Sequence, residues 1–319
     1  MSHIVTPLRR TSMDLLVLGA TGVAGRSTLR ALAAAGHRVR AHARTRDKAD
    51  LVRSLGATAV AGHAEDTDTL LGWLAGMDAV VDLRVAIPSG GRAMLPFAWR
   101  EYARLRGVES GRVVAAALEA GVPLVVHDTV TMVYADGGDT LLDEKAPVHS
   151  PGALAANLAA EHHLAALTRA GGRGVALRFG HFYGPDDAIT RDLVRGARAG
   201  HALVLGDPAG WSSAIHTDDV GLAVVAALDV PAGVYNVVDE EPMRRRDWLA
   251  LLAESVGRES LKQPPGFLTA VASAPLKALA RSHRVSAQRF RETSGWRPTV
   301  PSRRVGWPGI PLSAEGGRR

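Results

Sequence analysis

A glycine-rich turn closes the first strongly apolar segment of the chain. The segment DLLVLGA covers residues 14–20, and Gly19, Gly22 and Gly25 follow at intervals of three. The first glycine of such a turn permits a tight bend, the second lets the backbone approach a pyrophosphate, and the third lets the next helix pack on the strand. The alternative is a tight turn that binds nothing. We expect a dinucleotide to contact Gly19, Thr21, Gly22, Val23, Ala24 and Gly25.

The residues after the second expected strand discriminate between NADP and NAD. Arg44-Thr45-Arg46 stands where NAD sites carry an acidic residue, and Lys48 follows. An acid there would repel the 2′-phosphate of NADP, whereas guanidinium groups bind it through paired hydrogen bonds. The sequence therefore favours NADP, with Arg44 and Arg46 as ligands. NAD stays open as the alternative, because Asp47 lies in the same loop.

Short apolar strands alternate with helical patterns in the first half of the chain, as is typical of a parallel α/β sheet. We predict an α/β fold, with a Rossmann-type doubly wound parallel sheet and a smaller C-terminal substrate-binding lobe. Expected strands cover residues 14–20, 37–44, 57–62, 77–85, 123–134, 174–180 and 233–239. Expected helices cover residues 24–35, 47–55, 66–75, 108–120, 153–170, 218–228, 246–256 and 286–294.

The alternation ends near residue 181, where glycine, proline and aspartate become frequent. We assign residues 13–180 to a dinucleotide-binding Rossmann domain, to which residues 213–228 are expected to return. The rest of 181–312 is expected to form the lobe. Residues 1–12 and 313–319 are expected to be tails.

The composition excludes several classes of protein. With 46% hydrophobic and 22% charged residues, the 319-residue chain is typical of soluble globular proteins, and no apolar run is long enough to span a membrane. The absence of cysteine excludes disulfides and a thiol nucleophile, and it fits a cytoplasmic location. The formal net charge is +6, but the arginines are spread along the chain and aromatics make up only 5%, so we expect no nucleic-acid partner.

Six motifs occur in a characteristic order. They are GATGVAG at 19–25, Gly62 to Asp66 with His63 in place of an acid, RFGHFYGP at 178–185, IHTDDVGLA at 215–223, GVYNVVDEEP at 233–242 and GWRPTVP at 295–301. With these motifs the chain resembles the extended short-chain dehydrogenase/reductase family, in its NAD-dependent epimerase/dehydratase branch, over roughly residues 13–307. The resemblance implies a nicotinamide cofactor and an enzyme. We also expect Leu83, Arg84 and Phe179 to contact the cofactor.

The resemblance fails at the family's catalytic pair. In that family a tyrosine exchanges a proton with the substrate, and a lysine four residues later lowers its pKa and orients the ribose. Ala153 and Asn157 occupy these two positions here, and Val130 stands where the family has serine or threonine. The chain therefore resembles an atypical member without the standard proton relay.

Four residues are candidates to replace the relay: Thr129, Thr131, His181 and Tyr183. Histidine can exchange protons near neutral pH, although His181 could instead be a structural hydrogen-bond partner. Tyr183 matches a tyrosine that the family keeps for structure. The two threonines could orient a substrate carbonyl or could only pack.

The expected substrate end also departs from the family pattern. The arginine that clamps a nucleotide diphosphate in nucleotide-sugar members is missing, because the matching stretch is Trp211-Ser212-Ser213-Ala214. This absence indicates a flatter and less charged substrate than a nucleotide sugar. Trp99 could line an apolar pocket or belong to the core. The substrate-binding candidates are Arg84, Trp99, Asn157, His181 and Trp211.

These patterns favour an NADP(H)-dependent oxidoreductase that transfers hydride between a cofactor and a carbonyl or alcohol. Its substrate is expected to be a non-nucleotide, apolar or aromatic small molecule, and its proton donor to be non-standard. The alternatives are a redox-neutral cyclase, dehydratase or isomerase, and a non-enzymatic NADP-binding regulator. We expect a homodimer formed through helices 108–120 and 153–170, and no metal site.

Overall fold

The computed structural model describes residues 12–263 and 272–310. Its centre is a seven-stranded sheet in the order β11-β7-β5-β4-β1-β2-β3, and all its neighbouring strands are parallel. This arrangement confirms the Rossmann-type prediction. The strands are β1 (Asp14–Leu18), β2 (Arg38–His42), β3 (Thr58–Val60), β4 (Ala79–Asp82), β5 (Leu124–Val130), β7 (Arg173–Phe179) and β11 (Gly233–Val237).

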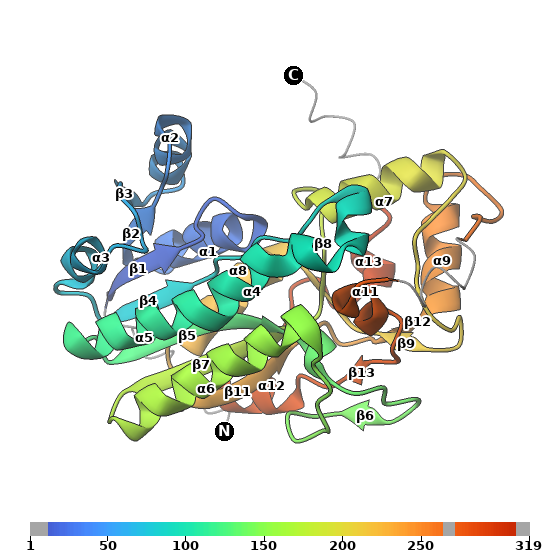
Figure 1. Ribbon diagram of the computed structural model, residues 1–319. Coiled ribbons are helices and arrows are strands. Elements are labelled where there is room, and N and C mark those ends of the chain that lie inside the picture. The colour runs from blue at the N-terminus through green and yellow to red at the C-terminus, as the bar shows by residue number, and fades with distance from the viewer. Residues whose placement is uncertain (1–11, 264–271, 311–319) are drawn as a thin grey trace, which may run out of the picture.

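Helices cover both faces of this sheet (Figure 1). One face carries α1 (Val23–Ala34), α2 (Arg46–Ser54), α8 (Thr217–Ala227) and α12 (Gln288–Ser294). The other face carries α3 (Thr67–Leu74), α5 (Ser110–Glu119) and α6 (Ala155–Arg169). Strands buried on both faces must be apolar at nearly every position, which is why β1 and β4 read as continuous apolar runs.

The helix expected at 108–120 begins eight residues earlier. It is one continuous helix made of α4 (Arg100–Ala103), a π-helical segment η3 (Arg104–Glu109) and α5. A π-helical turn contains an extra residue, so it displaces side chains from the 3.6-residue spacing by which a helix is recognised. The sequence pattern consequently detected only the regular part.

The strand expected at 123–134 is also shorter than predicted. β5 ends at Val130, where its pairing with Phe179 of β7 ends, and the chain turns into the 3₁₀ segment η4 (Thr131–Val133). Two further 3₁₀ segments, η1 (Gly90–Met94) and η2 (Pro96–Trp99), follow β4, and η5 (Gly152–Leu154) precedes α6.

The C-terminal part is built from short elements. Three small sheets pair β10 with β8, β12 with β9, and β13 with β6. Its elements are β6 (Leu141–Leu142), β8 (His181–Tyr183), α7 (Ala188–Arg198), β9 (Trp211–Ser212), β10 (Ala214–His216), β12 (Met243–Arg244), α9 (Arg245–Glu254), α11 (Ala274–Leu279), β13 (Arg284–Val285) and α13 (Arg303–Gly306).

One strand within the range assigned to the lobe lies in the central sheet. β11 pairs with β7 along its whole length, and α12 packs against it, so residues 233–237 extend the Rossmann sheet. Residues 213–228 also reach the sheet, because α8 packs on α1 and the N–H of Gly221 donates to Ser27 Oγ at 3.0 Å. The tails, apart from Ser12, lie outside the described residues. In the described ranges, every helix is too short or too polar to cross a membrane.

Candidate active site

Two glycines shape the turn between β1 and α1. Gly19 has a φ of 77°, and a Cβ there would lie 2.5 Å from the carbonyl oxygen of Leu83. A Cβ on Gly25 would lie 2.3 Å from the carbonyl oxygen of Gly19. The turn therefore lies directly against the residues that follow β4. Gly22, the residue before α1, is exposed and carries no capping side chain, as an approaching phosphate requires.

Alanine at Gly22 is expected to weaken NADPH binding at least about tenfold, or ~1.4 kcal/mol, while the free energy of unfolding changes little. Gly22 has a φ of −71°, and a Cβ there meets only the Gly19 carbonyl oxygen at 3.4 Å, so the fold accommodates it. The new methyl group would instead occupy space that a pyrophosphate needs. NADPH fluorescence titration and urea unfolding measure the two effects. The control is Gly72→Ala. Gly72 is exposed on α3, and no atom lies near the position of the new Cβ, so this variant should not weaken NADPH binding.

Arg44 and Arg46 are both exposed directly after β2. Thr45 between them caps α2 by accepting from the N–H of Lys48 at 3.4 Å. A further cation, Arg26 of α1, donates to the carbonyl oxygen of Thr21 at 3.0 Å and so lies against the glycine turn. Arg26 was not among the residues predicted from the sequence, because its position in the helix does not indicate that its side chain bends back to the turn.

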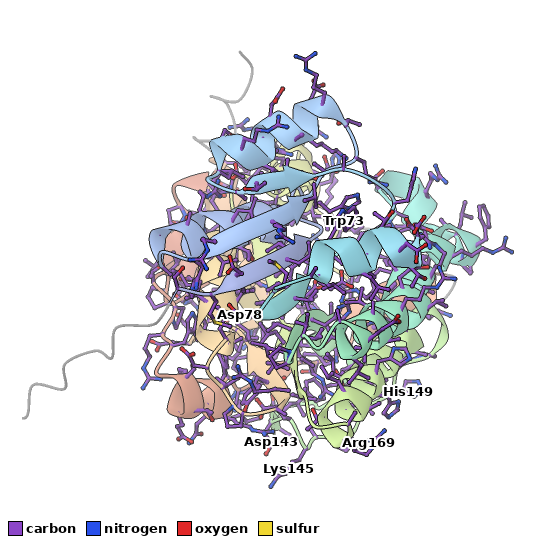
Figure 2. The ribbon with its side chains drawn as sticks, turned by 90° about the vertical axis from the view of Figure 1, so that its left-hand side faces the viewer. Trp73, Asp78, Asp143, Lys145, His149 and Arg169 are labelled. Carbon is purple, nitrogen blue, oxygen red and sulfur yellow. The ribbon has the colours of Figure 1, made fainter. Side chains whose placement is uncertain are left out.

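The Gly62–Asp66 motif has a structural role. The side chain of Asp66 accepts from the N–H of Thr69 at 3.0 Å and thereby begins α3. A Cβ on Gly62 would lie 3.1 Å from the ring of Trp73, which is labelled in Figure 2. The Trp73 ring packs against His42 at a centroid distance of 4.9 Å. The motif thus fixes α3 beside the ends of β2 and β3.

The guanidinium of Arg84 is bound by a neighbouring carboxylate. Its Nε and Nη2 donate to the two carboxylate oxygens of Asp82, each at 2.9 Å, and both residues are buried. Burial favours the neutral carboxyl, but Arg84 and then His127 lower the pKa of Asp82 to about 2. Only Nη1 of Arg84 lacks a hydrogen-bond partner among the described residues. The charge of Arg84 is therefore balanced by Asp82, and its Nη1 is buried.

The position of the family's lysine is occupied by a fully buried amide. The side-chain nitrogen of Asn157 donates to the Leu154 carbonyl oxygen at 3.0 Å and to the hydroxyl of Tyr102 at 2.9 Å. The Tyr102 hydroxyl also lies 3.1 Å from the amide oxygen of Asn157. At the tyrosine position, Ala153 supplies only a methyl group. The structure therefore brings a phenol to this place from a different helix, α4.

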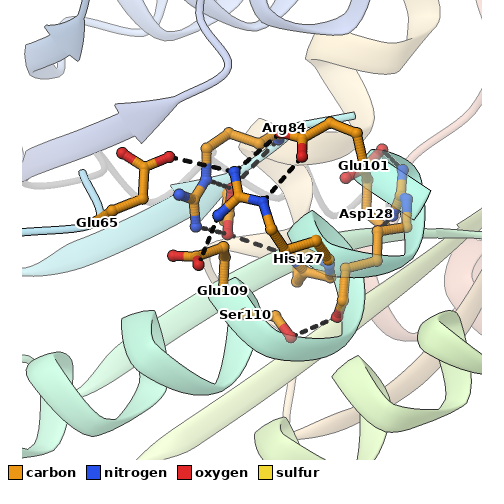
Figure 3. Close-up of polar contacts among 10 residues, drawn as sticks. Glu65, Arg84, Glu101, Glu109, Ser110, His127 and Asp128 are labelled. Carbon is orange, nitrogen blue, oxygen red and sulfur yellow. Dashed lines mark hydrogen bonds and ion pairs between the residues drawn. The ribbon is translucent and has the colours of Figure 1, made fainter. Parts of the chain in front are cut away.

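A buried ion pair lies beside Tyr102. Arg106 of the π-helical segment donates to the carbonyl oxygen of Asp128, and its Nη2 lies 2.7 Å from the Asp128 carboxylate. The Arg106 guanidinium also lies over the Tyr102 ring, 5.4 Å from its centroid. Figure 3 shows Asp128 close to this helix, from which the labelled Glu101, Glu109 and Ser110 come. The π-helical turn thus places a cation between the helix and the end of β5.

The two threonines differ in their surroundings. Thr129 donates to Glu161 of α6 at 3.2 Å, and Glu161 accepts two hydrogen bonds from Arg178 of β7, at 2.7 and 2.6 Å. Thr131 is buried at the start of η4. Thr129 thus belongs to a charged network that ties α6 to the sheet, and its candidate catalytic role stays a prediction.

His181 and Tyr183 lie in β8, which pairs in parallel with β10, and they share a second polar region. Burial, and then the positive charge of Arg303, lower the pKa of His181 to about 3, so its imidazole is neutral at pH 7. As a neutral ring it can form hydrogen bonds, but it does not carry the exchangeable charge that the sequence suggested. Tyr183 is buried against His216 and Trp307, and burial raises its pKa. Burial also raises the pKa of nearby Asp239 to about 8.

Two arginines from other strands lie against Trp211, although residues 211–214 themselves contain no cation. Arg244 of β12 lies 4.3 Å from the Trp211 ring centroid, and Arg284 of β13 lies 4.8 Å from it. The indole nitrogen donates to Asp139 at 2.7 Å, and Arg244 pairs with the same carboxylate at 3.1 Å. Both arginines are distant in sequence from residues 211–214, so counting residues before the His-x-x-Asp motif could not detect them.

The remaining candidates lie in packed surroundings. Trp99 is 5% exposed, donates to the Ala93 carbonyl oxygen at 2.9 Å and packs edge-on against Tyr102. Leu83 and Phe179 are buried at the carboxyl ends of β4 and β7, the edge at which parallel α/β sheets bind ligands. Within residues 12–263 and 272–310, we find no cluster of three metal-binding side chains.

Sequence reasoning missed four residues near the expected catalytic position: Tyr102, Arg106, Glu161 and Arg178. Tyr102 could have been found from the sequence, because the chain has only four tyrosines and each is a possible substitute for the missing catalytic tyrosine. Arg106 and Asp128 are separated by 22 residues and meet only through the packing of a helix on a strand.

Residues 15–237 match the family model described as NAD dependent epimerase/dehydratase family. Two curated relatives are similar to the chain. A 3-diazoavenalumate denitrifying reductase from a Streptomyces species is 32% identical, with 92% of this chain and 99% of the relative covered. A 4-hydroxy-2-methyl-3-oxo-4-farnesyl-3,4-dihydroquinoline-1-oxide ketoreductase from Stigmatella aurantiaca is 30% identical, with 77% and 74% covered.

Solved structures share the fold at lower identity. DesIV, a dTDP-glucose 4,6-dehydratase from Streptomyces venezuelae with NAD and TYD bound, matches with a TM-score of 0.80 at 20% identity, covering 96% of this chain and 98% of that one. MoeE5 in complex with UDP-glucuronic acid and NAD matches with a TM-score of 0.77 at 22% identity, covering 95% and 99%. The family and the two reductase relatives make this chain an enzyme with an oxidoreductase-like role. The chain belongs to the NAD dependent epimerase/dehydratase family.

Proposed function

We propose that the enzyme is an NADP(H)-dependent reductase that acts on a carbonyl group of a non-nucleotide aromatic small molecule. The observation that carries this proposal is the tightly packed Gly19–Gly25 turn, which ends in an exposed, uncapped Gly22, while Arg44 and Arg46 are exposed after the neighbouring strand β2. The backbone of the turn would hold the pyrophosphate, and Arg44 and Arg46 the 2′-phosphate. Leu83, Arg84 and Phe179 would complete the site. NADPH, when bound, supplies the hydride.

The substrate class is inferred from the region around Trp211. An indole with two guanidinium groups on its ring suits a flat molecule that carries an acidic substituent. The names of both curated relatives describe non-nucleotide compounds, one of them an acid anion and the other a quinoline oxide. We therefore propose an aromatic, anionic substrate in place of the less charged molecule that the sequence suggested.

Purified enzyme is expected to oxidise NADPH, followed at 340 nm, in the presence of at least one member of a panel of aromatic ketones and quinones bearing carboxylates. Uncharged analogues of the same ketones are the control, and they should have a higher KM. Absence of NADPH oxidation with the whole panel would contradict the reductase proposal. Turnover of a substrate without any change at 340 nm would favour a redox-neutral enzyme.

A diazo compound is the second candidate substrate, because a relative matched over 92% of this chain is named a denitrifying reductase of one. Hydride addition to the carbon of an aryl diazonium ion forms a C–H bond, and the C–N bond breaks with release of N₂. That reaction balances without a proton donor, which is compatible with the loss of the family's tyrosine. Nitrogen release together with NADPH oxidation, from an aryl diazonium salt added to the same assay, would identify it.

We also propose a cytoplasmic homodimer that forms through α5 and α6. These helices lie side by side on one face of the molecule, and α5 and the segment before it expose Val108 and Leu118 (Figure 1). Small residues along α6, such as Ala155 and Ala159, would let a second copy approach closely.

A further inference from the structure

We propose that Tyr102 donates the proton for carbonyl reduction, with Asn157 and Arg106 as its positioning residues. This inference rests on the proposed reductase function. In this proposal a tyrosine from a facing helix takes the place of the family's tyrosine, and an amide at the lysine position takes the place of its lysine. Sequence motifs cannot show such an exchange, because the new partners are 55 residues apart.

Packing explains why the phenol lies at this place. Ala153 lies in η5, and its side chain is a single methyl group. Both η2 and α4 contact η5, and they contribute the rings of Trp99 and Tyr102, whose centroids are 5.4 Å apart. The Tyr102 hydroxyl then reaches the amide nitrogen of Asn157 at 2.9 Å. The phenol thus lies within hydrogen-bond distance of the side chain that replaces the family's lysine.

The surroundings of Tyr102 suit a group that gives up a proton and regains it. Rotation about the C–O bond lets the hydroxyl turn its hydrogen from the Asn157 oxygen to a substrate oxygen, while it still accepts from the Asn157 nitrogen. Burial raises the pKa of Tyr102, whereas the Arg106 charge and the Asn157 hydrogen bond lower it. The effect of burial is the larger, so the phenol holds its proton until it is transferred to a substrate.

The proposed step is balanced. The carbonyl carbon gains a hydride from the reduced nicotinamide, so the carbonyl is reduced by two electrons and the nicotinamide is oxidised. The O–H bond of Tyr102 breaks and a new O–H bond forms on the substrate oxygen. The resulting phenolate takes a proton from solvent. One NADPH and one proton are consumed for each alcohol formed.

Tyr102→Phe is expected to lower kcat for a carbonyl substrate by about 10²–10⁴-fold and to leave the Kd for NADPH within about twofold. Tyr134→Phe is the matched control, because it removes another buried phenol bonded to an asparagine, Asn236, at 2.7 Å. It should leave kcat unchanged within about threefold. Asn157→Ala is expected to shift the alkaline limb of the pH profile of kcat, which loss of packing alone would not do.

A readout that needs no turnover is the carbon NMR signal of ring-labelled tyrosine. The chain has only four tyrosines, so the signal that disappears in Tyr102→Phe identifies Tyr102. Addition of NADP⁺ is expected to shift this signal and to leave the signal of Tyr235, at the far edge of the sheet, in place.

The outcomes separate this inference from the proposed function. NADPH oxidation that persists in Tyr102→Phe within threefold would overturn the role of Tyr102 and leave the reductase intact, as would a Tyr102 signal that NADP⁺ does not move. If wild-type enzyme turns over only diazonium substrates, and Tyr102→Phe does so equally well, Tyr102 is likewise not a proton donor. Absence of NADPH and NADP⁺ binding to wild-type enzyme would overturn both proposals.

Discussion

Aspartate at both Arg44 and Arg46 is expected to weaken NADPH binding by about 10²–10⁴-fold and to leave NADH binding equal or stronger. Hydrogen bonds to charged groups contribute about 1.5–3 kcal/mol each, and the double variant removes two of them. It also places two negative charges where the 2′-phosphate would lie. NADH carries no such phosphate, so its affinity should not fall when these two arginines are removed. Fluorescence titration of the four nicotinamide dinucleotides measures the change.

The matched control for this variant is Arg53→Asp. Arg53 lies on the same helix, α2, and is exposed and paired with Asp50 at 2.7 Å. It should leave both affinities unchanged. An equal loss of NADPH and NADH affinity in the double variant would mean that Arg44 and Arg46 act on the fold or on the pyrophosphate. Tighter binding of NADH than of NADPH by wild-type enzyme would show that the assignment of NADP is wrong.

Arg106→Met is expected to lower the free energy of unfolding by about 3–5 kcal/mol, measured by urea denaturation. Arg106 and Asp128 are both buried, and removal of the guanidinium would leave the Asp128 carboxylate ionised without a partner in a low dielectric. The double variant Arg106→Met/Asp128→Asn is expected to recover part of this loss, because neither charge of this pair would remain.

The exposed pair Arg53–Asp50 provides the comparison for stability as well. Arg53→Met should cost less than about 1 kcal/mol, because solvent already screens both charges. A loss of similar size for Arg106→Met would show that Arg106 and Asp128 do not form a buried pair in solution. Since Arg106 also lies over the Tyr102 ring, the same variant should lower kcat more than it changes the Kd for NADPH.

The region around β4 and β5 shows why charge cannot be read from sequence position alone. The guanidinium of Arg84, a predicted cofactor and substrate contact, is paired with Asp82 two residues earlier. Residues 211–214 contain no cation, yet β12 and β13 bring Arg244 and Arg284 to the Trp211 ring. The partners of Trp211 are set by the tertiary packing of distant strands, which a linear pattern does not encode.

The sequence by itself determined the sheet, the glycine turn and the absence of the usual tyrosine and lysine. These features depend on local order, because strand burial, a positive φ at Gly19 and the spacing within one helix are properties of neighbouring residues. Only the tertiary structure decided which side chains lie around Asn157. Tyr102 and Arg106 come from the continuous helix that contains the π-helical turn, Asn157 from α6 and Asp128 from β5, and they meet because that helix packs against both α6 and the end of β5.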